Sequence, residues 1–195
     1  ADLLPTPTNY PKNPKSPYAL QKSIIEDYLS LYNELYGMDT VSLRFFNVFG
    51  PNGIASGAYS TAIAAWLTAI HKGEDLRLDG DGTQTRDMCY IDNTVDALIR
   101  AAEHKDKLGG EAFNVACNDQ VSNNEILAAL RYRYPLLNVV NAPTRAGDVK
   151  HTRADISRTT FKLGYAPIVK FWDGLERTIE WYDLKWPIIE VINAQ

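Results

Sequence analysis

The chain has 195 residues, of which 45% are hydrophobic and 23% charged, and its formal net charge is −4. Such a composition is typical of a globular protein with a proper core, organised as one domain or as parts of two. The acidic balance argues against nucleic-acid binding, which needs a basic surface. No apolar run approaches the roughly 20 residues that cross a bilayer, so we expect no membrane insertion.

The cysteines and histidines indicate the compartment and argue against a metal. Cys89 and Cys117 form no CxxC or pairing pattern, and this suits a reducing cytoplasm. We expect both to be small buried residues. The opening residues lack the basic start and apolar centre of a signal peptide. His71, His104 and His151 are scattered without ligand-like spacing, so no metal site is predicted.

The first strong element is a helix over residues 17–36, which follows an irregular, proline-rich approach in residues 1–15. Ser16 suits the N-cap and Pro17 the first turn, while Gly37 suits a left-handed C-terminal cap. Apolar and aromatic side chains recur three and four positions apart and occupy more than one face. This helix is therefore expected to have a second partner surface.

Tyr18 and Lys22 lie four positions apart near the start of this helix, so their side chains share one face. A lysine ammonium beside a phenol favours the phenolate, and a phenolate can take a proton from a sugar or alcohol hydroxyl as hydride leaves the same carbon. The alternative is chance, because this spacing is common on helices.

A buried strand of a parallel sheet is predicted over residues 40–46. Phe46 and Asn47 lie at its carboxyl end, where doubly wound folds bind ligands. Asn47, between apolar neighbours, needs a hydrogen-bond partner, which favours a ligand. Plain core packing is the alternative for Phe46.

A helix over residues 59–72, with Trp66 in the core, is expected next. The short strand 76–79 and the Asp81-Gly82 turn after it predict a hairpin. Arg86 follows that turn, and its guanidinium can hold two phosphate oxygens. A salt bridge to Asp87 is the alternative for Arg86.

The remaining elements alternate in type. Asp92 is expected to cap a helix over residues 94–105, and Ser122 with Glu125 forms a capping box. Strands are predicted at 112–116 and 138–141, and helices at 126–132 and 171–182. Between the last two of these elements, a further helix is expected to have Asp155 as its cap and to end at Gly164. The expected core of the smaller domain comprises Phe161, Leu163, Phe171, Leu175, Ile179 and Trp181.

The loop over residues 144–152 is the second ligand signal. Arg145, Asp148 and Lys150 surround Gly147, and two basic residues with an acid suit a diphosphate and a ribose diol. A solvated loop is the alternative.

Three motifs in this order resemble the extended short-chain dehydrogenase/reductase family, and specifically its nucleotide-sugar epimerases and dehydratases. They are the Tyr18–Lys22 pair, LRFFNVFGP at 43–51 and GDGTQTRD at 80–87, and the resemblance covers nearly the whole chain. It implies an α/β fold, the C-terminal part of a Rossmann-like doubly wound sheet interleaved with a small α/β substrate domain. Residues 1–50 and 92–117 would belong to the NAD-binding domain, and 51–91 and 118–195 to the nucleotide-sugar-binding domain.

The resemblance also implies residue roles. Tyr18 would be the catalytic base, Lys22 would support it and hold the nicotinamide ribose, and Phe46 would contact the nicotinamide end of NAD. Asn47 would bind the phosphate or sugar of the substrate. The resemblance implies contacts to the rest of the substrate as well. The strand with Arg77 and Leu78 would lie along the nucleotide base, Arg86 and Arg145 would bind the diphosphate, and Asp148 would bind the ribose. Thr152 would limit the size of the sugar that is accepted.

The implied activity is NAD-dependent 4-epimerisation of a UDP-hexose through a transient 4-keto sugar. The closest resemblance is to UDP-N-acetylglucosamine 4-epimerases, and a small Thr152 would admit the N-acetyl group. The family packs the helix at 17–36 against its copy, which implies a homodimer. The alternatives are a UDP-glucose 4-epimerase, a nucleotide-sugar 4,6-dehydratase or decarboxylase, or a non-catalytic binding module.

Two departures from the family pattern bear on activity. The chain has no G-x-x-G-x-x-G turn and not the Ser or Thr that assists the tyrosine, and so it resembles the C-terminal part of a longer protein. By itself it is expected neither to hold NAD tightly nor to turn over substrate. Ala64 and Ala65 stand where related epimerases carry a proline and a basic residue, which removes one phosphate contact.

Overall fold

The computed structural model describes residues 3–56, 60–144 and 148–186. In chain order the elements are α1 (Pro17–Tyr36), β1 (Ser42–Phe45), β2 (Asn47–Phe49), α2 (Ala62–Lys72), β3 (Leu76–Asp79), β4 (Thr85–Arg86), β5 (Met88–Tyr90), α3 (Ile91–Ala102), β6 (Ala112–Val115), β7 (Val121–Ser122), α4 (Asn123–Arg133), β8 (Val139–Ala142), α5 (Ser157–Leu163) and α6 (Phe171–Lys185). None of the described helices has both the length and the apolar character that crossing a bilayer requires.

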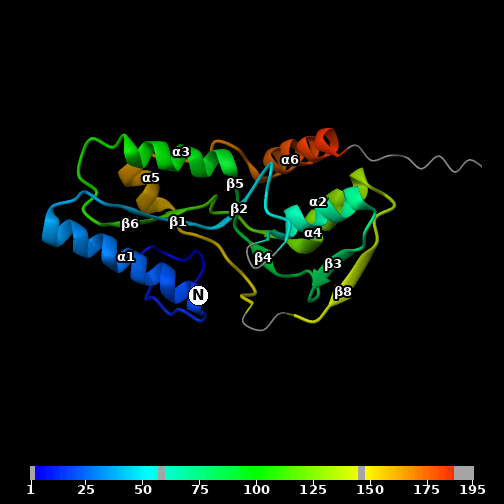
Figure 1. Ribbon diagram of the computed structural model, residues 1–195, viewed down its shortest axis with the longest axis horizontal. Coiled ribbons are helices and arrows are strands. Elements are labelled where there is room, and N and C mark those ends of the chain that lie inside the picture. Colours follow the sequence, from blue (N-terminus) through cyan, green and yellow to red (C-terminus); the bar gives the residue numbers. More distant parts are fainter. Residues whose placement is uncertain (1–2, 57–59, 145–147, 187–195) are drawn as a thin grey trace, which may run out of the picture.

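The elements form two halves that lie side by side (Figure 1). In one half, β1 pairs in parallel with β6, with α1 on one side of the strands and α3 and α5 on the other. In the second half, β3 pairs in parallel with β8 beside α2, α4 and α6. Each half has its own apolar cluster, one around Phe113 and Val115 and the other around Leu67 and Leu175. The α/β class is therefore as predicted.

One extended segment connects the halves. β1 runs parallel to β6 up to Phe46, whose N–H donates to the carbonyl of Val115 at 3.1 Å. From Asn47 onward the segment runs parallel to β5 instead, starting with a 3.2 Å bond to the carbonyl of Asp87. The parallel pairing was predicted, but the burial was wrong, because only Ser42 of the four β1 residues is buried.

Helix α1 has the predicted bounds. The hydroxyl of Ser16 accepts the N–H of Ala19 at 3.1 Å, and Gly37 ends the helix at a φ of 66°. None of its residues is buried. Its large apolar side chains are exposed within this chain, and Leu35 and Tyr36 are 60% and 70% exposed. The dimer that the sequence predicts through this helix stays a prediction.

The expected hairpin after β3 is wrong. β3 pairs with β8, more than 60 residues later, and not with a neighbouring strand. The Asp81-Gly82 turn instead meets the start of α4, where the N–H of Asn124 donates to the carbonyl of Gly82 at 3.0 Å. Gly82 has a φ of 77°. The turn signal is local, whereas the partner of β3 is decided by a distant strand.

Three of the expected core and cap positions also differ from the prediction. Phe161 is 91% exposed, because the short α5 buries Thr159 and Leu163, four apart, and Phe161 falls on the opposite face. Leu163 is buried, but in the cluster of Phe113. Asp92 lies in the first turn of α3 and is not its N-cap.

Two other local predictions are confirmed: the capping box of Ser122 and Glu125 opens α4, and Trp66 is buried. Asp155 is not the N-cap of α5, which is Ile156, although its carboxylate accepts the N–H of Ser157 at 2.8 Å. Cys89 is buried, while Cys117 is only partly buried. Within the described part of the chain, no cluster of three or more His, Cys, Asp and Glu residues could hold a metal ion, and the expectation of no metal site stays a prediction.

Asp183 ties three helices of the second half together. Its Oδ1 accepts the hydroxyl of Tyr134 at 2.7 Å and lies 3.0 Å from Nε2 of His71, and its Oδ2 accepts Nη2 of Arg133 at 2.7 Å. Burial by itself would raise the pKa of Asp183, but the hydrogen bonds from Tyr134, Arg133 and His71 outweigh burial and hold that pKa below its usual range.

We predict that Asp183→Asn lowers the free energy of unfolding at pH 7 by about 2 kcal/mol, because bonds to a charged acceptor are lost. A lowered folded-state pKa contributes stability above the unfolded value of about 3.9, and that stability is lost as pH falls through the folded pKa. The wild-type advantage should therefore shrink below about pH 4 in urea titrations. Glu180→Gln, at an exposed position of α6, is the control; equal unfolding midpoints for Asp183→Asn and wild type at pH 7 would contradict the prediction.

Candidate functional site

Tyr18 and Lys22 lie together on the first turns of α1. Nζ of Lys22 is 5.4 Å from the centre of the Tyr18 ring, so the ammonium stands over the aromatic face. The cap at Ser16 and the proline at position 17 fix this turn of the helix. The predicted shared face is therefore observed, and the ring of Tyr18 remains 49% exposed.

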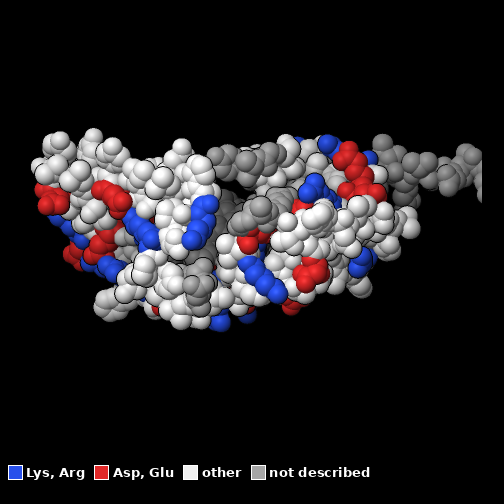
Figure 2. All heavy atoms as spheres, turned by 90° about the horizontal axis from the view of Figure 1, so that it is seen from below, with Lys and Arg blue, Asp and Glu red and all other residues white. Residues whose placement is uncertain are grey.

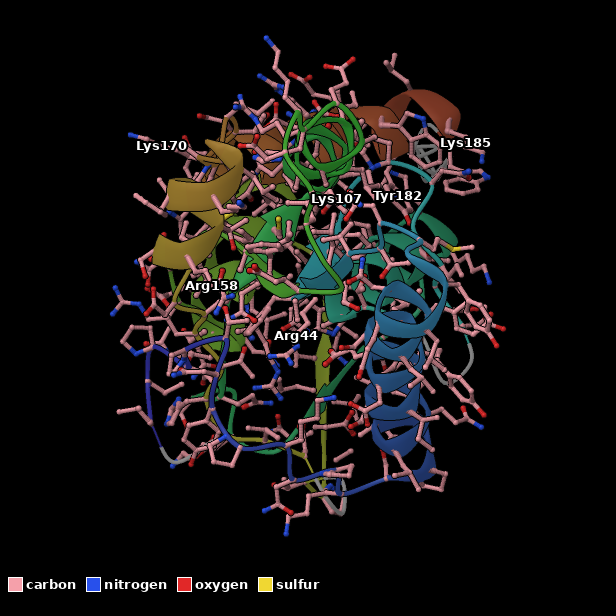
Figure 3. The ribbon with its side chains drawn as sticks, turned by 90° about the vertical axis from the view of Figure 1, so that its left-hand side faces the viewer. Arg44, Lys107, Arg158, Lys170, Tyr182 and Lys185 are labelled. Atoms are coloured by element: carbon pink, nitrogen blue, oxygen red, sulfur yellow. The ribbon has the colours of Figure 1, made fainter. Side chains whose placement is uncertain are left out.

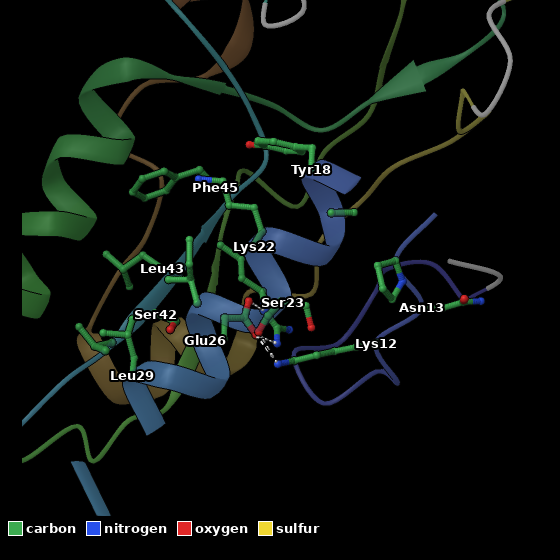
Figure 4. A pocket seen from close by; sticks show the side chains of 15 residues that line it. Lys12, Asn13, Tyr18, Lys22, Ser23, Glu26, Leu29, Ser42, Leu43 and Phe45 are labelled. Carbon is green, nitrogen blue, oxygen red and sulfur yellow. Dashed lines mark hydrogen bonds and ion pairs between the residues drawn. The ribbon is translucent and has the colours of Figure 1, made fainter. Parts of the chain in front are cut away.

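The pair lines a cleft of about 580 Å³ between α1 and β1 (Figure 4). This volume lies within the usual range for small-molecule sites. Polar groups from Lys12, Tyr18 and Lys22 share the cleft with an apolar wall. That wall includes Ile25, Leu29, Val41, Leu43 and Phe45.

A partly buried ion-pair network connects α1 to β1 and so helps to fix the position of the helix that carries Tyr18 and Lys22. Arg44 donates to both carboxylate oxygens of Glu26, from Nε and Nη2, each at 2.7 Å. Nζ of Lys12 adds a contact to Glu26 at 3.2 Å. Burial would raise the pKa of Glu26, but the bonds from Arg44 and Lys12 lower it overall. Figure 3 shows Arg44 between α1 and α5, in the middle of this half.

Asn47 and Thr152, more than 100 residues apart in sequence, meet where the chain passes between the halves. Oγ1 of Thr152 donates to Oδ1 of Asn47 at 3.5 Å and accepts the N–H of Asp87 at 3.1 Å. The structure therefore places two of the predicted substrate residues side by side. It also supplies a protein partner for the Asn47 oxygen.

Arg86 faces the segment after residue 147. Its Nη2 donates to Oδ1 of Asp148 at 2.6 Å, and its Nη1 donates to the carbonyls of Thr85 at 3.0 Å and Lys150 at 3.2 Å. The alternative of an Arg86–Asp87 salt bridge is wrong, because the Asp87 carboxylate accepts backbone N–H groups instead. Two more predicted substrate residues are thus in contact.

A second cleft, of about 470 Å³, adjoins Asp148 and Lys150. Its other lining residues are Gly80, Asp81, Gln84, Ala142, Pro143, Thr144 and Val149. Figure 2 shows the molecule hollowed between its halves, with Lys and Arg side chains on both sides of the hollow. The described lining of the second cleft carries charges of both signs, from Lys150 and from Asp81 and Asp148.

The remaining predicted residues are distributed differently. Arg77 projects from β3 and pairs with Asp79 at 2.8 Å, whereas the Leu78 side chain is 5% exposed and part of the core, so only its backbone is available to a ligand. Phe46 is half-buried at the junction of β1 and β2. Arg145 lies outside the described residues.

Sequence reasoning missed Asp87 as part of this site. Its side chain is completely buried, and it contacts each segment that carries Asn47 and Thr152. The only available signal is a carboxylate directly after Arg86, for which the sequence offers a salt bridge to that arginine as one alternative.

Comparison with known proteins places this geometry among sugar-nucleotide enzymes. The model of the "NAD dependent epimerase/dehydratase family" matches residues 4–116, more than half of the chain. UDP-glucose 4-epimerase of Mycolicibacterium smegmatis is 33% identical over 185 residues, which are 91% of this chain and 56% of that protein.

Solved structures give the same result. UDP-glucose 4-epimerase of Thermotoga maritima, solved with UDP-glucose, has a TM-score of 0.87 at 30% identity and covers 94% of this chain and 58% of its own. UDP-N-acetylglucosamine 4-epimerase of Methanobrevibacter ruminantium, in complex with UDP-N-acetylmuramic acid, has a TM-score of 0.85 at 34% identity, with 93% and 58% covered. The chain thus spans somewhat more than half the length of these proteins.

We predict that Glu26→Gln destabilises the chain by about 1–2 kcal/mol, because an amide nitrogen would replace one of the oxygens that face the Arg44 guanidinium. Thermal unfolding followed by circular dichroism measures the effect. Glu34→Gln, an exposed position on the same helix, should unfold like wild type. A Glu26→Gln chain as stable as the Glu34→Gln chain would show that the network does not hold α1.

Proposed function

Because the chain belongs to the NAD-dependent epimerase/dehydratase family, we propose that it binds the nucleotide-sugar in a 4-epimerase that acts on UDP-hexoses. The observation that carries the proposal is the joining of four predicted substrate residues into two contacting pairs. The pairs are Asn47 with Thr152 and Arg86 with Asp148. Both pairs join residues more than 60 positions apart in sequence, and all four residues are ones that the family resemblance connects with the substrate.

Arg86 and Asp148 suit the nucleotide end of such a substrate. A guanidinium has five N–H donors, and in Arg86 both Nη1 donors and one Nη2 donor have protein acceptors. Nε and the second Nη2 hydrogen have no hydrogen-bond acceptor among the described residues, so in the proposal they donate to phosphate oxygens. The carboxylate of Asp148 can accept from a ribose hydroxyl while it keeps Arg86 in place.

Tyr18 and Lys22 suit the reacting end. The family's NAD, when bound, supplies the hydride acceptor. The cleft fits a nicotinamide riboside, because Tyr18 and Lys22 offer hydrogen-bonding groups beside apolar walls. In the proposal, Tyr18 would accept the proton of the C4 hydroxyl when the sugar is oxidised and would return it when the 4-keto sugar is reduced. Lys22, whose Nζ is 5.4 Å from the centre of the Tyr18 ring, would help to hold the nicotinamide ribose beside it.

Thr152 supports N-acetylated substrates. It is a small residue at the position that the family resemblance connects with sugar size, and it contacts Asn47. We therefore favour UDP-N-acetylglucosamine and UDP-N-acetylgalactosamine. UDP-glucose is the second candidate, because the relatives from M. smegmatis and T. maritima are named for it.

The cofactor side of the proposal is limited to the residues of this chain. No G-x-x-G-x-x-G turn occurs among its glycines, and such a turn is what brings backbone N–H groups to a pyrophosphate. We propose that the 195-residue chain binds the sugar nucleotide and, by itself, does not turn it over.

A homodimer through α1 is part of the proposal. Leu20, Ile24, Tyr28, Leu31 and Leu35 recur three and four apart, and each is between 42% and 60% exposed. An apolar stripe of this length on one helix suits packing against a second copy of that helix.

We expect the chain to bind UDP-N-acetylglucosamine and UDP-glucose in isothermal titration, the first more tightly. Arg86→Ala should weaken both about 10- to 100-fold, because it removes charge-assisted bonds to the diphosphate. Arg158→Ala, an exposed position paired with Glu111 in the other half, should bind like wild type. Absence of wild-type binding to either UDP-sugar, or equal affinities for Arg86→Ala and Arg158→Ala, would remove the proposal.

For the dimer, we predict that the double substitution Ile24→Lys and Leu31→Lys produces a monomer, because two charges would have to be desolvated in the helix interface. Light scattering after size exclusion gives the mass. Ile168→Lys, which is also an exposed isoleucine (61%) but lies outside α1, should leave the dimer intact. A monomeric wild-type chain would contradict this part of the proposal.

A further inference from the structure

Asp87 is a fully buried carboxylate in the segment between β4 and β5. Its Oδ1 accepts the N–H of Cys117 and its Oδ2 the N–H of Ala154, both at 2.9 Å. No lysine or arginine in the described parts of the chain forms an ion pair with it. Because a buried charge is costly unless its bonds are satisfied, these backbone groups are what makes the carboxylate tolerable there.

The turn after β6 is shaped to receive this carboxylate. The amides of Asn118 and Asp119 also lie against Asp87, and Asn118 has a left-handed φ of 53°. Successive N–H groups in such a turn form a concave surface that binds anions. Burial still raises the pKa of Asp87 in spite of these bonds. The backbone geometry, however, is that of a site built for a carboxylate.

The main chain of Asp87 contacts both Asn47 and Thr152, the two residues that are proposed to face the sugar. Its N–H donates to Oγ1 of Thr152 at 3.1 Å, and its carbonyl accepts the N–H of Asn47 at 3.2 Å. The Thr152 hydroxyl therefore accepts from Asp87 and donates to Asn47. Through Ala154, the carboxylate holds the segment on which Thr152 lies, two residues away.

We propose that Asp87 is a positioning residue that sets the direction of the Asn47 amide and the Thr152 hydroxyl toward the sugar; this rests on the proposed binding of a UDP-sugar. Asp87 is 0% exposed, so it acts through these two side chains and not by touching the substrate. Arg86 is held separately, by Asp148 and two backbone carbonyls. The nucleotide contacts are therefore expected to be largely independent of the Asp87 side chain.

The substitution Asp87→Asn separates these roles at nearly constant volume. One oxygen of the carboxylate becomes an NH₂ donor, which then faces the N–H of either Cys117 or Ala154. Two donors cannot bond to each other, so one of the two segments loses its attachment. Thr152 or the turn at 117–119 then shifts relative to Asn47.

The test compares UDP with UDP-N-acetylglucosamine in isothermal titration of the 195-residue chain. The dissociation constant for UDP divided by that for UDP-N-acetylglucosamine measures how much affinity the sugar adds. Asp87→Asn should reduce this ratio about tenfold while the affinity for UDP changes less than about threefold. Thr178→Val, which removes an equally buried hydrogen bond within α6, should leave the ratio unchanged. Equal losses for both ligands, or no loss, would overturn the positioning role.

A ligand-free measurement keeps this inference separate from the proposed function. In ¹⁵N NMR spectra, Asp87→Asn should shift the side-chain amide signals of Asn47, and Thr178→Val should not. If wild type binds neither UDP nor the UDP-sugar, the proposed function fails, and these spectra still decide the positioning. Unshifted Asn47 signals in Asp87→Asn would overturn it.

If the Asp87→Asn chain does not fold, amide hydrogen exchange of the wild-type chain tests the positioning role instead. The amides of Cys117 and Ala154 lie outside every helix and strand, yet the carboxylate should make them exchange as slowly as the amide of Val115 in β6. Exchange of either amide at the rate of an exposed loop would overturn the inference.

Discussion

The continuous segment from Ser42 to Phe49 is the constraint on which the rest of the structure depends. One strand serves two sheets, because its first four residues pair with β6 and its last three with β5. The two apolar clusters are therefore held in register by covalent bonds and not only by surface contact. Asn47 stands at the point of exchange, where both halves are close enough to contribute to one site.

Partly and fully buried carboxylates reinforce the structure in two chemically different ways. Glu26 and Asp183 each accept from an arginine, and their pKa values are lowered although burial opposes this. Asp87 has backbone N–H groups as its partners, and its pKa is raised by burial. The first two join helices to their neighbours. Asp87 joins loops at the site through backbone N–H groups alone, which leaves the nearby Arg86 to other acceptors.

The sequence predicted features that depend on a few adjacent residues. The caps at Ser16 and Gly37 and the capping box at Ser122 need only local backbone geometry, and all three are confirmed. The partner of β3 was predicted wrongly, and so was the alternative of an Asp87 salt bridge for Arg86, because the observed partners lie more than 60 residues away. For the site, the family resemblance named Asn47 and Thr152 as candidate substrate contacts, but only the folded chain shows that they touch.

The distribution of polar groups bears on how an epimerase of this kind could let its sugar turn. On the proposed function, the nucleotide end meets the Arg86–Asp148 pair and the cleft beside Lys150, while the sugar end meets Asn47 and Thr152. Charge-assisted bonds are about twice as strong as neutral ones. Most of the binding free energy would then come from the diphosphate, and the neutral amide and hydroxyl could exchange sugar partners without releasing the substrate. If Thr152 were replaced by arginine, charge-assisted bonds would form to the sugar as well, and the difference in strength between the two ends would be lost.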